Sequence, residues 1–179
     1  MELIVENRIT LKQLTKADAS DIYATISSQR EYLGKWLPFV EHTKSVSDTQ
    51  AFVNSIIDLP EEIMEYTFTI RVDGCLAGLI GFKDTDRTNR KTEIGYWLSR
   101  EYQGRGIMTK SLKRLCEFAF RELNMNRVQI KCAVGNSSSI AIPERLGFKR
   151  EGTERDGELL SGDTFTDLYI YSLLKGEYI

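Results

Sequence analysis

The amino-acid sequence predicts a mixed α/β fold, in which a central mixed, mostly antiparallel sheet has helices on both faces. Residues 66–98 contain three extended runs in close succession, a pattern typical of an antiparallel meander. A long amphipathic segment and then an extended run, residues 128–134, follow it. Strands on either side of such a helix are expected to be parallel and joined by a right-handed crossover.

The first part of the chain is expected to hold one strand and two helices. Ile9–Leu14 alternates apolar and polar residues, as a half-buried strand does. Thr15 followed by Asp18 is typical of a helix start, and apolar residues continue the stripe. A second helix is expected to begin with a capping box over Ser47–Gln50 and to end before Pro60. Its apolar face is expected to hold Phe52, Val53, Ile56 and Ile57.

The meander consists of Tyr66–Val72, Leu76–Lys83 and Thr92–Leu98. Asp73-Gly74 between the first two is a strong hairpin signal, whereas Asp84–Lys91 is expected to be a polar connection. The amphipathic helix places Met108, Leu112, Leu115 and Ala119 on one face. After the strand Val128–Val134, the pattern predicts a shorter helix over Asn136–Leu146, a strand after Gly147-Phe148 and a last strand over Thr164–Leu174.

Length and composition are typical of one globular domain spanning residues 1–179. The net charge is −2 and no long basic block is present, so no nucleic-acid groove is expected. The N-terminus lacks the pattern of a secretion signal, and the longest apolar run, Leu76–Phe82, is too short to span a membrane. We therefore expect a cytoplasmic protein.

Cysteine and histidine usage argues against a metal site. Cys75, Cys116 and Cys132 are odd in number and far apart, which fits neither a disulfide framework nor a zinc site. At least two of them are expected to be buried, reduced thiols. His42 is the only histidine, so no multi-histidine metal site is possible.

Gly104 and Gly106 stand between a predicted strand and the long helix. Glycine there permits a positive φ and a close backbone approach to a ligand. The first amides of a helix lack internal partners and attract anions, and Gln103 and Arg105 add side-chain donors. The simpler alternative is a tight turn. Two other phosphate-binding motifs, the nucleotide-triphosphate loop and the dinucleotide fingerprint, both fail because Thr109 stands where a glycine is required.

The loop Gln103–Met108 resembles the Q/R-x-x-G-x-G/A signature of the GCN5-related N-acetyltransferases (GNAT), with Met108 in place of the final small residue. Glu93–Leu98 resembles the strand before that loop, and Asn136 to Ser139 with Pro143–Phe148 resembles the family's second cofactor motif. Tyr32–Phe39 is similar to the Rim branch, which acetylates the N-termini of ribosomal proteins. The resemblance covers nearly the whole chain in the right order.

The resemblance implies acetyl-coenzyme A as cosubstrate and no metal. It places the cofactor on Trp97, Leu98, Ser99, Gln103, Gly104, Arg105, Gly106, Ile107, Met108, Thr109, Asn136 and Ser139. Backbone amides near a strand irregularity at residues 97–99 are expected to face the transition-state oxyanion. It also implies a homodimer or higher homo-oligomer that pairs through the late strands.

The implied reaction is attack of a neutral amine on a thioester. An α-amino group with a pKa of about 7.7–8.0 is roughly one-tenth neutral at pH 7, far more than a lysine amine with a pKa of about 10.4. A weak base acting through water therefore suits a protein N-terminus. Glu158 is the favoured base with Ser139 as the acid, as in the ribosomal-serine type of enzyme, and Glu93 is the alternative base. Simpler readings are a solvated glutamate and a helix-start hydroxyl.

Two structural expectations concern the acceptor side. Tyr32, Trp36, Leu37 and Phe39 either line the amine's entry channel or pack in the core. Pro143 cannot donate to the carbonyl of Ser139, so that carbonyl is expected to be free, with a bend in the helix. The acceptor is expected to be a protein N-terminus. A polyamine or aminoglycoside is the alternative within the class, and a non-catalytic acyl-coenzyme A module is the alternative outside it.

Overall fold

The computed structural model describes residues 1–63 and 65–178. Within them, eight strands form one sheet in the order β1-β2-β3-β4-β5-β6-β8-β7. Neighbouring strands are antiparallel, except β5 and β6, which are parallel as predicted. The strands are β1 Glu2–Glu6, β2 Ile9–Gln13, β3 Thr67–Val72, β4 Cys75–Asp86, β5 Lys91–Leu98, β6 Arg127–Ala133, β7 Lys149–Leu160 and β8 Thr164–Leu174.

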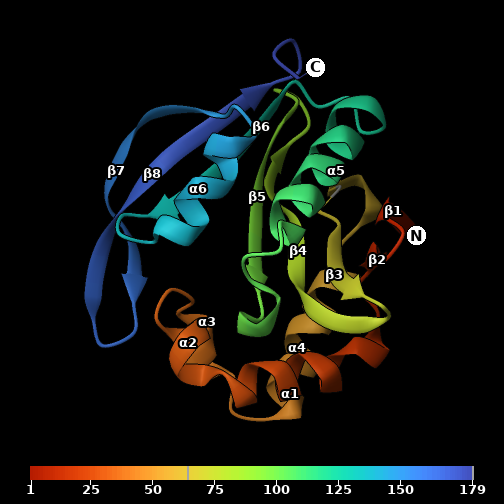
Figure 1. Ribbon diagram of the computed structural model, residues 1–179, viewed down its shortest axis with the longest axis vertical. Helices are drawn as coiled ribbons and strands as arrows, with labels where there is room; N and C mark the ends of the chain where they lie inside the picture. The colour runs from red at the N-terminus through yellow and green to blue at the C-terminus, as the bar shows by residue number, and fades with distance from the viewer. Residues whose placement is uncertain (64, 179) are drawn as a thin grey trace.

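Helices cover both faces of the sheet (Figure 1), which confirms the predicted architecture. On one face, α5 and α6 pack on the larger apolar core, to which β5 contributes Ile94. On the other face, α1 to α4 pack around Leu79 and Trp97. Ile94 and Trp97 lie an odd number of positions apart on β5, so their side chains point to opposite faces. The helices are α1 Ala19–Ser28, α2 Arg30–Gly34, α3 Phe39–His42, α4 Val46–Ile57, α5 Ile107–Arg121 and α6 Ser137–Arg145, with short 3₁₀ turns η1 Lys16–Asp18, η2 Glu61–Ile63 and η3 Arg100–Tyr102.

Local sequence signals located most turns and strand ends correctly. Asp73 and Gly74 have φ values of 49° and 81°, as the two central residues of a tight hairpin turn require. The last strand matches its predicted bounds. The polar connection is shorter than predicted, because β4 continues to Asp86. Cys116 and Cys132 are buried free thiols, whereas Cys75 is exposed.

The sequence-based assignment of the N-terminal region needs four corrections. It missed β1, which pairs with β2, and it missed the short helices α2 and α3. The capping box lies at Ser45 rather than Ser47, because the Ser45 amide donates to the Asp48 carboxylate at 2.8 Å. The buried stripe of α4 is also narrower than predicted: Val53 is buried, but Phe52 and Ile57 are 43% and 37% exposed.

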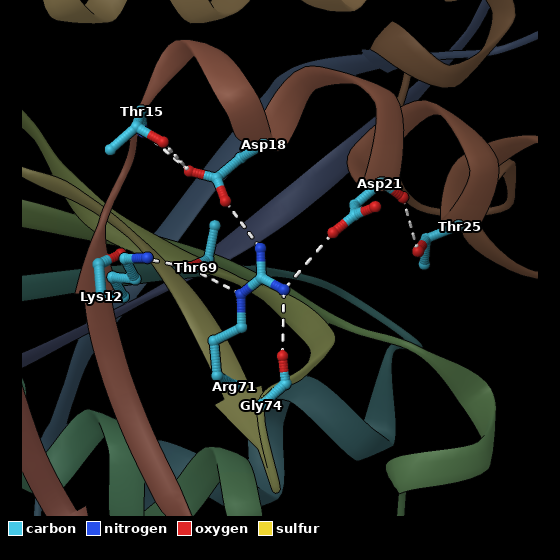
Figure 2. A network of polar contacts seen from close by, with 8 residues as sticks. All are labelled: Lys12, Thr15, Asp18, Asp21, Thr25, Thr69, Arg71 and Gly74. Atoms are coloured by element: carbon cyan, nitrogen blue, oxygen red, sulfur yellow. Dashed lines mark hydrogen bonds and ion pairs between the residues drawn. The ribbon is translucent and has the colours of Figure 1, made fainter.

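A largely covered arginine, Arg71, fixes the start of α1 on the sheet (Figure 2). Arg71 on β3 contacts the Asp18 carboxylate at 2.6 Å and that of Asp21 at 3.4 Å, and it donates to the Gly74 carbonyl at 3.1 Å. The Asp18 side chain is only 5% exposed, and its other oxygen accepts from the Thr15 amide, as the predicted helix start requires. Because Asp18 is buried, removing Arg71 leaves an uncompensated charge beneath the start of α1.

No helix in the described residues combines the length and apolar character that crossing a bilayer requires.

Candidate active site

The parallel strands β5 and β6 separate in the middle of the sheet. They pair only where Lys91 to Glu93 meets Arg127 to Gln129, although β5 continues to Leu98 and β6 to Ala133. Beyond Glu93, β5 still pairs with β4 on one side. On its other side, no described strand pairs with it, so its backbone can bind an extended ligand there.

The glycine loop follows β5 and leads into α5. Gly104 and Gly106 have φ values of 72° and 71°, so both adopt the left-handed conformation that the sequence predicted. Gly106 is the N-cap of α5, and its carbonyl accepts the first helical bond, from the Lys110 amide. Among the described residues, the amides from Gly104 to Gly106 have no acceptor, and the first amides of α5 have none within the helix. This concentration of free N–H groups is suited to a diphosphate.

A cleft of about 730 Å³ joins this loop to the gap between the strands. Most of the predicted cofactor residues line it, namely Trp97, Leu98, Gln103, Gly104, Gly106, Ile107, Met108, Thr109, Asn136 and Ser139. Ser99 and Arg105 are not among the lining residues. The Ser99 amide donates to the Ala77 carbonyl at 2.7 Å and its hydroxyl accepts from Gln29, whereas the Arg105 guanidinium lies 5.9 Å from the Tyr102 ring centre.

The expected backbone irregularity also lies elsewhere. The register between β4 and β5 is regular from Gly78↔Leu98 to Lys83↔Glu93. The nearest shift falls between β3 and β4, at Ala77. Because the Ser99 amide is already paired with Ala77, that amide is not available to an oxyanion.

One wall of the cleft is formed by α2 and the segment that follows it. Tyr32 and Trp36 line the cleft, but Phe39 does not, and its side chain is 42% exposed on α3. The Tyr32 hydroxyl donates to the Leu98 carbonyl at 3.2 Å and accepts a hydrogen bond from the Gln103 side chain. These bonds connect α2 directly to β5 and to the glycine loop.

The two candidate bases lie together, outside the residues that line the cleft. Glu93 is buried, and both its oxygens are engaged: Lys83 Nζ lies 2.9 Å from one, and Gln129 Nε2 and Lys131 Nζ lie 3.2 and 3.9 Å from the other. Glu158 on β7 receives no hydrogen bond and no ion pair from the described residues. Burial raises its pKa, the charges of Lys83 and Lys131 lower it, and that of Glu93 raises it.

The candidate acid, Ser139, lies in the first turn of α6. Asn136 caps this helix, because its side chain accepts from the Ser139 amide at 3.2 Å. The Ser139 hydroxyl lies 3.4 Å from the Cys132 thiol and 3.3 Å from the Tyr96 hydroxyl. Sequence reasoning missed Tyr96 as a site residue. Strand alternation places it on the same face as Ile94, but only the tertiary structure brings it to Ser139.

Leu37 lines the cleft with Tyr32 and Trp36. Other lining residues that the sequence did not identify are Leu33, Tyr102, Lys110, Ser138, Ile142 and Arg145. Lys110 is held at the mouth of the cleft by Glu6, with both carboxylate oxygens 2.8 Å from its Nζ. Within the described residues, no three His, Cys, Asp or Glu side chains are grouped so that they could bind a metal.

A family model for the acetyltransferase (GNAT) domain matches residues 8–149. The chain belongs to the GNAT acetyltransferases. YdaF of Bacillus subtilis (strain 168) is 39% identical to this acetyltransferase, and the match covers 97% of the present chain and 95% of YdaF. The ribosomal-protein-serine acetyltransferase of Escherichia coli (strain K12) is 28% identical over 94% and 93% of the two chains.

The same fold occurs in a solved structure of RimL, a ribosomal L7/L12 alpha-N-protein acetyltransferase in complex with coenzyme A. It superposes with a TM-score of 0.92 at 26% identity and covers 97% of this chain and 98% of that one. The GNAT protein described here is therefore an acyltransferase that takes acetyl-coenzyme A as cosubstrate. Its free loop amides and the cleft beside them fit that molecule's diphosphate and its extended arm.

Proposed function

We propose that this acetyltransferase acetylates the N-terminal α-amino group of a protein, with a ribosomal protein as acceptor. The observation that supports this most directly is the Glu158 carboxylate, which has no hydrogen-bond partner among the described residues. Lys83 and Lys131 are paired with Glu93 and Glu154, and Asp84 also acts on Lys131. Carboxylates therefore outnumber lysines around Glu158, which suits a positively charged amino group as the incoming acceptor.

Glu158 serves as the general base, through a water molecule, and Ser139 donates the proton that the departing sulfur gains. The amine nitrogen forms its bond to the acetyl carbon and the carbon–sulfur bond breaks; the proton of the nitrogen passes through the water to Glu158, and the sulfur takes the proton of Ser139. Exchange with water then returns a proton to Ser139 and removes one from Glu158. Glu93 is the weaker candidate because three neighbouring side chains already engage its oxygens. Its negative charge raises the pKa of Glu158 and so opposes the lowering by Lys83 and Lys131.

The test of this proposal is a competition assay. The protein, acetyl-coenzyme A and peptides that begin with serine or alanine are incubated beside spermidine, and the products are identified by mass. Acetylation at the peptide N-terminus is expected, and Glu158→Gln is expected to lower kcat with little change in the Kd for acetyl-coenzyme A. Glu151→Gln, on the same strand but hydrogen-bonded to Arg127, is the control. Acetylated spermidine without acetylated peptide would refute the acceptor, and binding without thiol release would refute turnover.

We also propose that residues 1–179 act as one domain, in the cytoplasm, and as a homodimer. The β7–β8 hairpin projects beyond the helices (Figure 1) and carries Leu159 opposite Phe165, which are 44% and 58% exposed. An exposed apolar pair on a projecting hairpin is a natural site for self-association. Light scattering is expected to give twice the chain mass for the wild type and the monomer mass for Phe165→Asp.

A further inference from the structure

Tyr96 and Ser139 make two hydrogen bonds to each other. The Tyr96 hydroxyl donates to the Ser139 carbonyl at 3.2 Å, and the Ser139 hydroxyl donates to the Tyr96 hydroxyl oxygen at 3.3 Å. Both residues line the cleft. The pair therefore connects β5, where it separates from β6, to the first turn of α6, which carries the candidate acid.

Pro143 explains why the carbonyl is free to accept this bond. In a regular helix, the carbonyl of residue 139 accepts from the amide of residue 143, but proline has no N–H. The sequence predicted this free carbonyl, and in the structure Tyr96 occupies it. The hydrogen bond from the Tyr96 hydroxyl thus replaces the helical bond that Pro143 cannot make. This bond to the Ser139 carbonyl fixes the direction in which Ser139 faces.

The directions of these bonds form one chain. Because the only hydroxyl proton of Tyr96 goes to the carbonyl, its oxygen is left to accept from Ser139. The Ser139 oxygen is then free to accept from the Cys132 thiol, 3.4 Å away. Burial is the main cause that raises the pKa of Tyr96 well above its ordinary value, so the phenol stays protonated and this order of donors is retained at neutral pH.

We infer that Tyr96 is a positioning residue for Ser139, one that holds the serine hydroxyl at the cleft so that its proton can turn to an anionic sulfur. A thiolate is a stronger acceptor than a phenol oxygen, because hydrogen bonds to an ionised acceptor are the stronger ones. The proton of Ser139 therefore changes partner while the bond from Tyr96 to the carbonyl keeps the residue in place. This inference rests on the proposed role of Ser139 as the acid.

A double-mutant cycle tests the inference. Tyr96→Phe is expected to lower kcat by about three- to tenfold, the effect of one lost neutral hydrogen bond, with the KM for acetyl-coenzyme A nearly unchanged. In the Ser139→Ala background, the same substitution is expected to change kcat by less than about twofold, because Tyr96 then has no serine hydroxyl to hold. Tyr171→Phe is the matched control, since its hydroxyl also anchors α6, by donating to Glu144 at 2.9 Å, but does not contact Ser139.

Two results would overturn the inference: equal factors for Tyr96→Phe in both backgrounds, or an equal loss for Tyr171→Phe. Either would show that the tyrosine hydroxyl acts only by holding α6. The melting temperature of each variant shows that it is folded. Failure of the proposed function gives a different result from failure of this inference. If the enzyme acetylates no peptide, the double-mutant cycle is measured instead from the slow release of the coenzyme A thiol when water is the acceptor.

Discussion

Replacing Gly104 with alanine tests whether the loop after β5 exists to bind a diphosphate. Gly104 has a φ of 72°, and an added Cβ would meet no atom within 4 Å, so no steric clash complicates the substitution. An alanine held in this conformation costs about 1–2 kcal/mol. In the free protein, the Gly104 amide has no described acceptor, so the loop can relax to a negative φ without loss.

The cost then appears on binding, because the loop must return to its left-handed form to present its amides. At 1.4 kcal/mol for each tenfold, this corresponds to a Kd for coenzyme A raised by about 5- to 30-fold. Calorimetry with coenzyme A measures it. Acetyl-pantetheine, which lacks the diphosphate, is expected to bind wild type and Gly104→Ala equally.

Gly162→Ala is the matched control. Gly162 has a φ of 78° with the same free space around its Cβ position, but it lies in the tight turn between β7 and β8, where Leu160 pairs with Thr164. The strain there cannot relax, so the melting temperature is expected to fall by roughly 2–8 °C with no change in the Kd. A Gly104→Ala protein that binds coenzyme A like the wild type would refute the assignment of the loop.

Three further predictions concern pH and stability. The charge of Lys83 lowers the pKa of Glu158, so Lys83→Met is expected to raise that pKa further. Because Glu158 acts as a base only when it is ionised, the acid limb of the plot of kcat against pH is expected to move to higher pH. A move to lower pH would contradict the assignment of Glu158 as the base. Arg71→Leu leaves the buried Asp18 carboxylate without its cation and is expected to lower the free energy of unfolding in urea by about 3 kcal/mol, with partial recovery in the double variant that adds Asp18→Asn. Hydrogen bonds from an arginine on β6 and a serine on β8 lower the pKa of Glu151 to about 2. The stability that it contributes is therefore complete above its unfolded pKa of about 4.3 and is lost as the pH falls toward 2, so the wild-type melting temperature is expected to fall more steeply over this range than that of Glu151→Gln.

Local signals in the sequence were sufficient for most of the fold. Asp73-Gly74 gives the β3–β4 turn because both residues tolerate a positive φ, and the apolar spacing from Met108 onward gives α5 because the period is helical. β1 was missed because a short edge strand is stabilised by its pairing with β2 and not by its own pattern. The predicted start of α4 lies two residues too late because two possible capping boxes overlap, Ser45 with Asp48 and Ser47 with Gln50, and the structure forms the first.

The sequence by itself determined the conformation of the glycine loop and its free amides, since glycine conformation and helix-end amides are local properties of Gln103 to Gly106. It also determined the missing helical bond at Ser139, because proline lacks an N–H wherever it stands. Only the tertiary structure decided how the other groups meet. The Glu93 carboxylate is engaged by lysines from two different strands, Glu158 has no described partner, and Tyr96 reaches a helix 43 residues later in the chain. Contacts between side chains from distant strands depend on sheet order and on where β5 separates from β6, and neither is encoded in any short stretch of residues.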